Sequence, residues 1–174
     1  MPGDDLKASF NSAPDLTVGY GYRFHRNFQA DAGFETVFGS GDVEDYYESG
    51  FGPLRIRDYQ FFVPLGGRAI LPLASERLLI FGGGGGAYMR YSELIRQPSD
   101  YYRIDCPVCN SRSGWGYYAL AGASVALDQA RHFRLGISGR VVRGHTEGDY
   151  FAGIPPFRTS DRWLNIHAVF TVAF

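Results

Sequence analysis

Hydrophobic and polar residues alternate with a period of two along most of the chain. Between positions 59 and 73 the odd positions are apolar, and the even positions include the polar Gln60 and Arg68. Strict alternation is typical of a β-strand whose two faces meet different surroundings. The same pattern predicts strands at 16–24, 28–38, 59–73, 78–93, 115–127, 133–141 and 164–174, and a shorter eighth strand at 6–10.

Glycines blur the alternation in the segment 78–93. Gly82 to Gly86 follow one another there, but apolar residues remain in phase on either side of them. No Gly-Lys-Ser/Thr follows this run, so a phosphate-binding loop is excluded. The expected apolar face of this strand consists of Leu79, Phe81, Ala87, Met89 and Tyr91.

The predicted connections alternate between short and long. Tight turns fall at 25–27, 74–77 and 129–132, whereas long polar loops fall at 40–57, 95–113 and 147–160, with a short link at 12–14. Alternate connections of an up-and-down meander lie at the same end of the sheet. Tight turns at one end and long loops at the other are typical of outer-membrane barrels. No helix, linker or domain boundary is predicted, so 1–174 is expected to be a single domain.

Composition narrows the class of protein further. Hydrophobic residues make up 45% and aromatic residues 16% of the chain, which excludes a disordered protein. The net charge is -1, so there is no basic excess for binding nucleic acid. Lys7 is the single lysine among 17 lysine and arginine residues, unlike an ordinary soluble surface. No apolar run reaches the roughly 18 residues of a transmembrane helix, and the first residues do not read as a signal peptide.

Two segments carry a resemblance to a known family. Residues 18–38, with the text GYGYRFHRNFQADAGFE, resemble the first hairpin of OmpA/OmpX-type small barrels. The terminal Phe174, on an alternating last strand, resembles the assembly signal of bacterial outer-membrane proteins. The resemblance implies an all-β, eight-stranded antiparallel up-and-down transmembrane β-barrel in the Gram-negative outer membrane. It also implies a signal peptide that this chain does not contain, and recognition of the C-terminal strand by the barrel-assembly machinery. The short first strand departs from the family pattern.

The polar face of the strands is expected to line the lumen. Eight strands enclose an interior that side chains just fill, so we expect mutually neutralising ion pairs and no open pore. Asp31 and Glu35 are the expected acidic partners of Arg68, Arg90 and Arg140, since a guanidinium can bridge carboxylates. The predicted lumen network is Arg23, Asp31, Glu35, Arg68, Arg90, Asp128, Arg134, Arg140 and His167.

Aromatic residues gather near both ends of the predicted strands. Two such bands about one bilayer apart are typical of residues at membrane–water interfaces. The predicted interface aromatics are Phe24, Phe28, Tyr59, Tyr91, Trp115, Tyr117, Phe133, Trp163 and Phe174.

The two cysteines lie close together in a predicted long loop. Cys106 and Cys109 are separated by Pro107 and Val108. An oxidising cell surface favours a local disulfide; metal or partner capture and free thiols are the alternatives. Two thiols do not complete a zinc site, and we expect no cofactor and no metal.

The expected function is a structural or surface-interaction role in the outer membrane. The monomer would contact outer-membrane lipid, and an unidentified extracellular ligand where one exists, without enzymatic activity. One alternative is a lipid-modifying outer-membrane enzyme, some of which use a His/Ser/Glu group on the outer wall. His145, Thr146 and Glu147 cluster only loosely for that role, because the threonine falls on the opposite face. The other alternative is a soluble lipocalin-like barrel, whose outer face would be charged and whose cavity would be apolar.

Overall fold

The protein is all-β in the part of the chain that the structure describes. This computed structural model describes residues 2–4, 13–38, 47–49, 52–96, 111–148 and 158–173. No helix among these residues is long and apolar enough to cross a membrane. The strands are β1 (Pro2–Asp4), β2 (Asp15–His25), β3 (Phe28–Phe38), β4 (Tyr47–Ser49), β5 (Gly52–Leu73), β6 (Leu78–Arg96), β7 (Ser111–Ala126), β8 (Phe133–Gly148) and β9 (Arg158–Val172).

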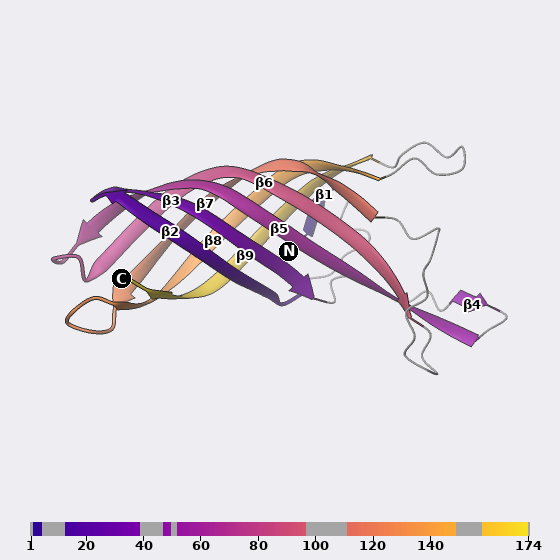
Figure 1. Ribbon diagram of the computed structural model, residues 1–174, viewed down its shortest axis with the longest axis horizontal. Coiled ribbons are helices and arrows are strands. Elements are labelled where there is room, and N and C mark those ends of the chain that lie inside the picture. Colours follow the sequence, from indigo (N-terminus) through magenta and orange to yellow (C-terminus); the bar gives the residue numbers. More distant parts are fainter. Residues whose placement is uncertain are drawn as a thin grey trace.

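Seven long strands form one antiparallel up-and-down sheet (Figure 1). The strand order is β1-β9-β8-β7-β6-β5-β3-β2, and the three-residue β4 pairs only with β5. Every long strand therefore lies beside its neighbour in sequence. The predicted all-β meander is confirmed, and several strands run longer than the alternation alone indicated.

The short connections all lie at the end of the sheet where the C-terminus is found (Figure 1). They are a turn at 26–27, a turn at 74–77 and a bend at 127–130. Positive φ angles occur in two of these connections, at Ala74, Ser75 and Glu76 before β6 and at Arg131 before β8. The prediction that tight turns share one end is confirmed for the described residues.

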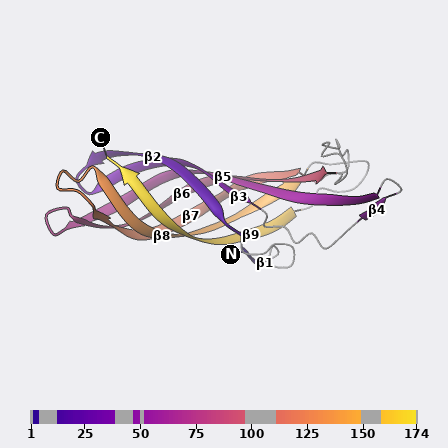
Figure 2. The same cartoon turned by 90° about the horizontal axis from the view of Figure 1, so that it is seen from below.

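The sheet curls strongly but is not closed into a barrel within the described residues. No backbone pairing joins β2 to β9, although these two edge strands run side by side in Figure 2. The expected eight-stranded closure is thus found only in part, as seven long strands. The strand predicted at 6–10 lies outside the described residues, and the short β1 pairs with β9 at Trp163 to Asp161 instead.

The convex face is apolar except toward the loop side, and the concave face holds the buried polar groups. On β9, Ile166 and Phe170 are 62% and 61% exposed, whereas the alternate residues Asn165 and His167 are buried. On β2, Tyr20 is 70% exposed. The predicted faces hold for β2, β3, β5, β7, β8 and β9.

The predicted faces of β6 are reversed. Met89 and Tyr91 are buried on the concave face, while Arg90 is exposed on the convex face. The predictions of Arg90 in the lumen and of Tyr91 at the membrane interface are therefore wrong. Pairing with β5 decides the phase, since Met89 lies opposite the buried Phe62. Because Gly82 to Gly86 carry no side chains, the alternation in the sequence does not show which face of β6 is concave.

The glycines of β6 allow close approach of the neighbouring strand. A Cβ added at Gly85 would lie 2.1 Å from the carbonyl oxygen of Leu65, and one at Gly83 would lie 2.1 Å from that of Gly67. At Gly86 the nearest atom would be 3.9 Å away. Backbone atoms cannot yield as a flexible side chain does, so two of these positions exclude any side chain.

We predict that Gly85→Ala destabilises the fold, and that Gly86→Ala does not. Overpacking of this kind costs about 1–3 kcal/mol, whereas the matched glycine has space for a methyl group. Urea unfolding in detergent micelles, followed by tryptophan fluorescence, measures both. Equal unfolding midpoints for the two variants would contradict the close approach of β5 and β6.

Candidate functional site

Glu35 lies at the centre of the polar interior. Its side chain is 0% exposed and its carboxylate pairs with the Arg140 guanidinium. Asn165 donates a second hydrogen bond from Nδ2 to the same carboxylate. Glu35 lies on β3 and these partners lie on β8 and β9, so the group links strands that are not all neighbours in the sheet. Glu35 and Arg140 form one of the pairings expected from sequence.

A second ion pair lies closer to the turn end than Glu35 does. Arg68 Nε donates to Asp31 Oδ2 at 2.6 Å, and Gln29 donates to the other oxygen of that carboxylate. The Arg68 guanidinium lies over the Phe81 ring at 4.9 Å from its centroid. Both charges are therefore compensated although both side chains are largely buried.

His167 bridges the two strands that the backbone leaves unpaired. Its Nε2 lies 2.9 Å from Asp15 Oδ2 and 3.3 Å from Thr17 Oγ1, across the seam between β9 and β2. Asp15, Glu35 and His167 bring ligand atoms within 4.8 Å of one another. The Arg140 cation already bound to Glu35 would repel a metal ion, so this geometry favours an ion-pair network.

Arg134 fills the turn end of the interior. It is 8% exposed and donates to the carbonyl oxygens of Glu76 and Arg77 and to Ser124 Oγ. Arg23 also lies at this end, but its side chain is more exposed and donates from Nε to the Arg26 carbonyl oxygen at 3.0 Å. These two arginines hold the turns together rather than pairing with the central carboxylates.

Asp128 does not lie in the lumen, and that prediction is wrong. It follows β7 in the connection to β8, where its carboxylate accepts hydrogen bonds from the backbone N–H groups of Phe133 and His132. These bonds lower the pKa of the carboxyl below its ordinary value. Because the pKa is lower in the folded chain, they stabilise the turn above the ordinary pKa. That contribution is lost as the pH falls through the folded value.

An aromatic cluster fills the loop side of the interior, which the sequence analysis missed. Trp163 is 2% exposed and donates from Nε1 to the Tyr91 hydroxyl at 2.7 Å. Phe62 packs edge-on against both rings. The prediction of Trp163 at the membrane interface is wrong. Its spacing of two from Asn165 was the signal that placed it on the inner face.

A buried polar group lies beside this cluster and was also missed. Thr146 donates to Asp161 Oδ2, and its hydroxyl lies 3.0 Å from the Thr159 hydroxyl. All three side chains are buried. They occupy inner positions of β8 and β9, and the alternation along β9 would have revealed Asp161.

The outer aromatic residues form rows near both ends of the strands. On the loop side, ring contacts run from Phe34 through Phe61 and Tyr88 to Trp115, across β3, β5, β6 and β7. On the turn side, Phe24 stacks with Phe28, and Phe133 stacks with Phe170. Of the predicted interface residues, Phe24, Phe28, Trp115, Tyr117 and Phe133 are exposed on the convex face.

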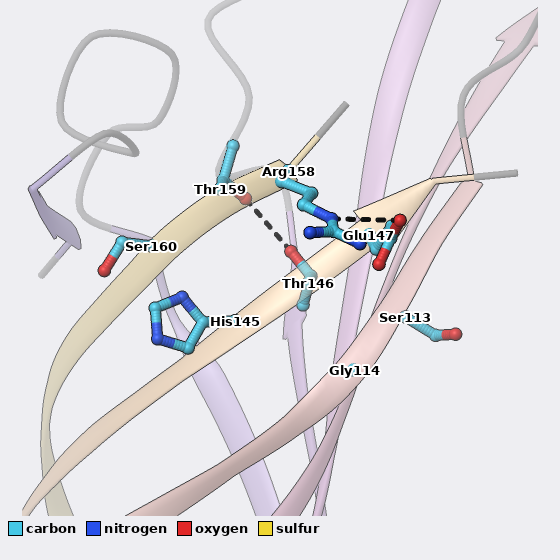
Figure 3. A pocket seen from close by; sticks show the side chains of 8 residues that line it. All are labelled: Ser113, Gly114, His145, Thr146, Glu147, Arg158, Thr159 and Ser160. Atoms are coloured by element: carbon cyan, nitrogen blue, oxygen red, sulfur yellow. Dashed lines mark hydrogen bonds and ion pairs between the residues drawn. The ribbon is translucent and has the colours of Figure 1, made fainter. Parts of the chain in front are cut away.

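A pocket of about 450 Å³ opens at the loop side of β7, β8 and β9 (Figure 3). His145 and Ser160 are direct register partners there, both exposed. Glu147 lies two residues from His145, and its carboxylate pairs with Arg158 at 3.0 Å. Pairing between strands thus places a serine beside a histidine, which local sequence spacing did not reveal. The lining residues are Ser113, Gly114, His145, Thr146, Glu147, Arg158, Thr159 and Ser160.

Some predicted residues lie outside the part that is described. They are Cys106, Cys109 and Phe174, together with the side chain of Tyr59.

Comparison with known proteins leaves the family of the chain open. No protein-family model matches the sequence, and no curated protein is significantly similar to it.

We predict that Glu35→Gln destabilises the fold strongly. The substitution leaves the Arg140 guanidinium buried without its counter-charge, at a cost of about 3–5 kcal/mol. The matched change Glu147→Gln breaks an exposed pair worth about 0–1 kcal/mol. Chemical unfolding in detergent compares them, and equal effects would contradict a central role for Glu35. Changing Arg140 to Met as well should recover part of the loss.

Proposed function

We propose that the chain is a small bacterial outer-membrane β-barrel with a structural or surface-interaction role. In this proposal the convex face contacts lipid, the interior is filled by polar side chains, and the tight turns lie on the periplasmic side. The chain acts as a monomer without a cofactor, and its C-terminal strand engages the barrel-assembly machinery. The relation to OmpA/OmpX-type barrels is part of the proposal.

The placement of apolar and charged side chains carries this proposal. Large apolar residues such as Val18 and Ile137 are 67% and 60% exposed, whereas Glu35 and Asp161 are buried. Soluble monomers do not usually expose apolar surface over a whole sheet face. A lipocalin-like barrel would have the opposite arrangement. Lipid is the solvent in which the observed arrangement is favourable.

Two further observations support a lipid environment. Exposed aromatic rows border the apolar face at both ends, as at the two interfaces of a bilayer. The long strands, such as β8 and β9 with 16 and 15 residues, exceed the roughly 9–11 needed to cross. An open sheet edge is costly in hydrocarbon, so closure across the seam between β9 and β2 belongs to the proposal.

The absence of an open pore is also part of the proposal. The concave side is filled by the pairs Glu35–Arg140 and Asp31–Arg68 and by the aromatic cluster around Trp163. Side chains of this size fill the interior of an eight-stranded barrel.

We predict that Ile166→Arg prevents stable insertion into bilayers. A charge on the lipid face costs about 2–4 kcal/mol near the midplane, whereas an exposed substitution in a soluble protein typically changes stability by within about 0.5 kcal/mol. Urea-unfolded protein is diluted into phosphatidylcholine vesicles, and the folded fraction is read from unboiled and boiled gels. Ile166→Leu is the control. Two results would overturn the proposal. The parent chain would fold in buffer without lipid or detergent, and the Ile166→Arg variant would fold as well as the parent.

A second candidate function is a lipid-modifying enzyme, which the pairing of His145 with Ser160 favours. Both side chains are exposed on the loop side, above the apolar face. The Arg158 cation already engages Glu147, the acidic residue nearest in sequence. Incubation of folded protein with lipopolysaccharide, followed by mass spectrometry of its lipid part, tests this function. A change in lipid mass that disappears in His145→Ala supports it, and unchanged lipid with the folded parent excludes it.

A further inference from the structure

We propose that Arg143 and Arg162 form a binding site for the phosphate of a lipid headgroup. The two arginines lie on the convex face at the loop-side border of the apolar surface. The inference rests on the proposed membrane location and adds a ligand class to it.

The two guanidinium side chains come from directly paired positions. Arg143 of β8 is the register partner of Arg162 of β9, and both are exposed. Directly opposite residues have Cβ atoms about 4.5–5.5 Å apart, and like charges there are destabilising. The next residues in the same row are Tyr117 on β7 and Gly3 on β1. Among the described residues, no carboxylate therefore lies in this row to neutralise the pair.

Glu147, which follows Arg143 by four residues on the same face of β8, is already engaged. Glu147 pairs with Arg158 at 3.0 Å. Among the convex-facing residues of β6 to β9 whose side chains the structure describes, the charged ones at the loop side are Arg90, Arg143, Glu147, Arg158 and Arg162. The chain as a whole has a net charge of only -1, so this positive excess is local.

The position of the pair selects a lipid over a soluble anion. One step toward the turns, the same face carries Val141 and Leu164, and Ile166 and Phe170 continue it along β9. Tyr117, 63% exposed, flanks Arg143 on the other side. An anion held by the arginines would thus lie at the edge of a surface suited to acyl chains.

The chemistry of arginine fits a phosphate group. A guanidinium presents a planar set of N–H donors that bind phosphate oxygens in pairs. A phosphate monoester carries enough negative charge to neutralise two neighbouring arginines and relieve their repulsion. A zwitterionic headgroup offers less net charge for this purpose.

Quenching by brominated lipid tests the site, because the exposed Trp115 lies near it on the convex face and Trp163 is buried inside. Folded protein is reconstituted in dioleoyl-phosphatidylcholine with increasing fractions of brominated phosphatidic acid or brominated phosphatidylcholine. The ratio of the two quenching curves gives the relative affinity for the phosphate monoester. We expect the parent to prefer phosphatidic acid about tenfold, as two interfacial arginines allow.

The double variant Arg143→Gln/Arg162→Gln should lose this preference and still show heat-modifiable folding. The matched control Arg26→Gln/Arg77→Gln removes the same charge at the turn end, where both side chains are exposed, and should keep it. A preference retained by the first variant, or lost in the control, overturns the site.

The remaining outcomes separate the site from the membrane proposal. Equal quenching of the parent by both brominated lipids overturns the site but leaves the membrane location intact. Absence of quenching by either lipid contradicts the membrane location itself. Loss of the preference in millimolar inorganic phosphate would show that the arginines bind free phosphate, and would overturn the assignment to a lipid.

Discussion

Every second residue of the curled sheet must fit into its concave side, and this constraint shapes the rest of the molecule. Charged groups placed there are largely removed from water, so each needs a partner of opposite charge or a set of hydrogen bonds. Glu35 illustrates the consequence, because Arg140 and Asn165 reach it from β8 and β9 while it projects from β3. Such bonds tie distant strands together and favour the curled form over a flat one.

Different polar groups fill the interior at three levels along the strands, namely the turn end, the middle and the loop side. At the turn end, Arg134 donates to the carbonyl oxygens of Glu76 and Arg77 in the tight turn at 74–77. Between the two ends, the opposite charges of Glu35 and Arg140, and of Asp31 and Arg68, compensate each other. At the loop side, the Trp163 indole N–H and the Tyr91 hydroxyl satisfy each other within an aromatic cluster. Most buried polar groups thus find partners at each of the three levels, whereas the Gln60 amide, Arg140 Nε and Asp161 Oδ1 have no hydrogen-bond partner among the described residues.

The sequence predicted the faces of most strands because the alternation is a local property of the chain. It failed at β6, where five consecutive glycines carry no side chains and both Tyr88 and Met89 are apolar enough for either face. Pairing with β5 resolves that ambiguity, and pairing is not local. The same reason explains why Asp31 and Glu35 were expected among the ion pairs but their partners were not unique. The sequence offered Arg68, Arg90 and Arg140 equally as partners of these carboxylates. Only the pairing of β6 with β5 shows that Arg90 lies on the convex face. His145 and Ser160 became neighbours only through the register of β8 and β9.

The glycines of β5 and β6 connect the sequence to the filled interior. Gly66 and Gly83 belong to neighbouring strands, and a Cβ at Gly66 would lie 2.5 Å from the Tyr118 hydroxyl, while one at Gly83 would lie 2.8 Å from the Cβ of Arg68. Their lack of side chains leaves room for the large groups beside them. Arg68 lies over the Phe81 ring and Arg140 over the Tyr118 ring, each within about 5.3 Å of the ring centroid. A cation stacked in this way is held by its ring as well as by its carboxylate. Small residues on β5 and β6 thus permit a ring-supported ion-pair network that extends from β3 to β8. That network makes the concave side a packed core, which is what the proposed lipid-facing barrel without a pore requires.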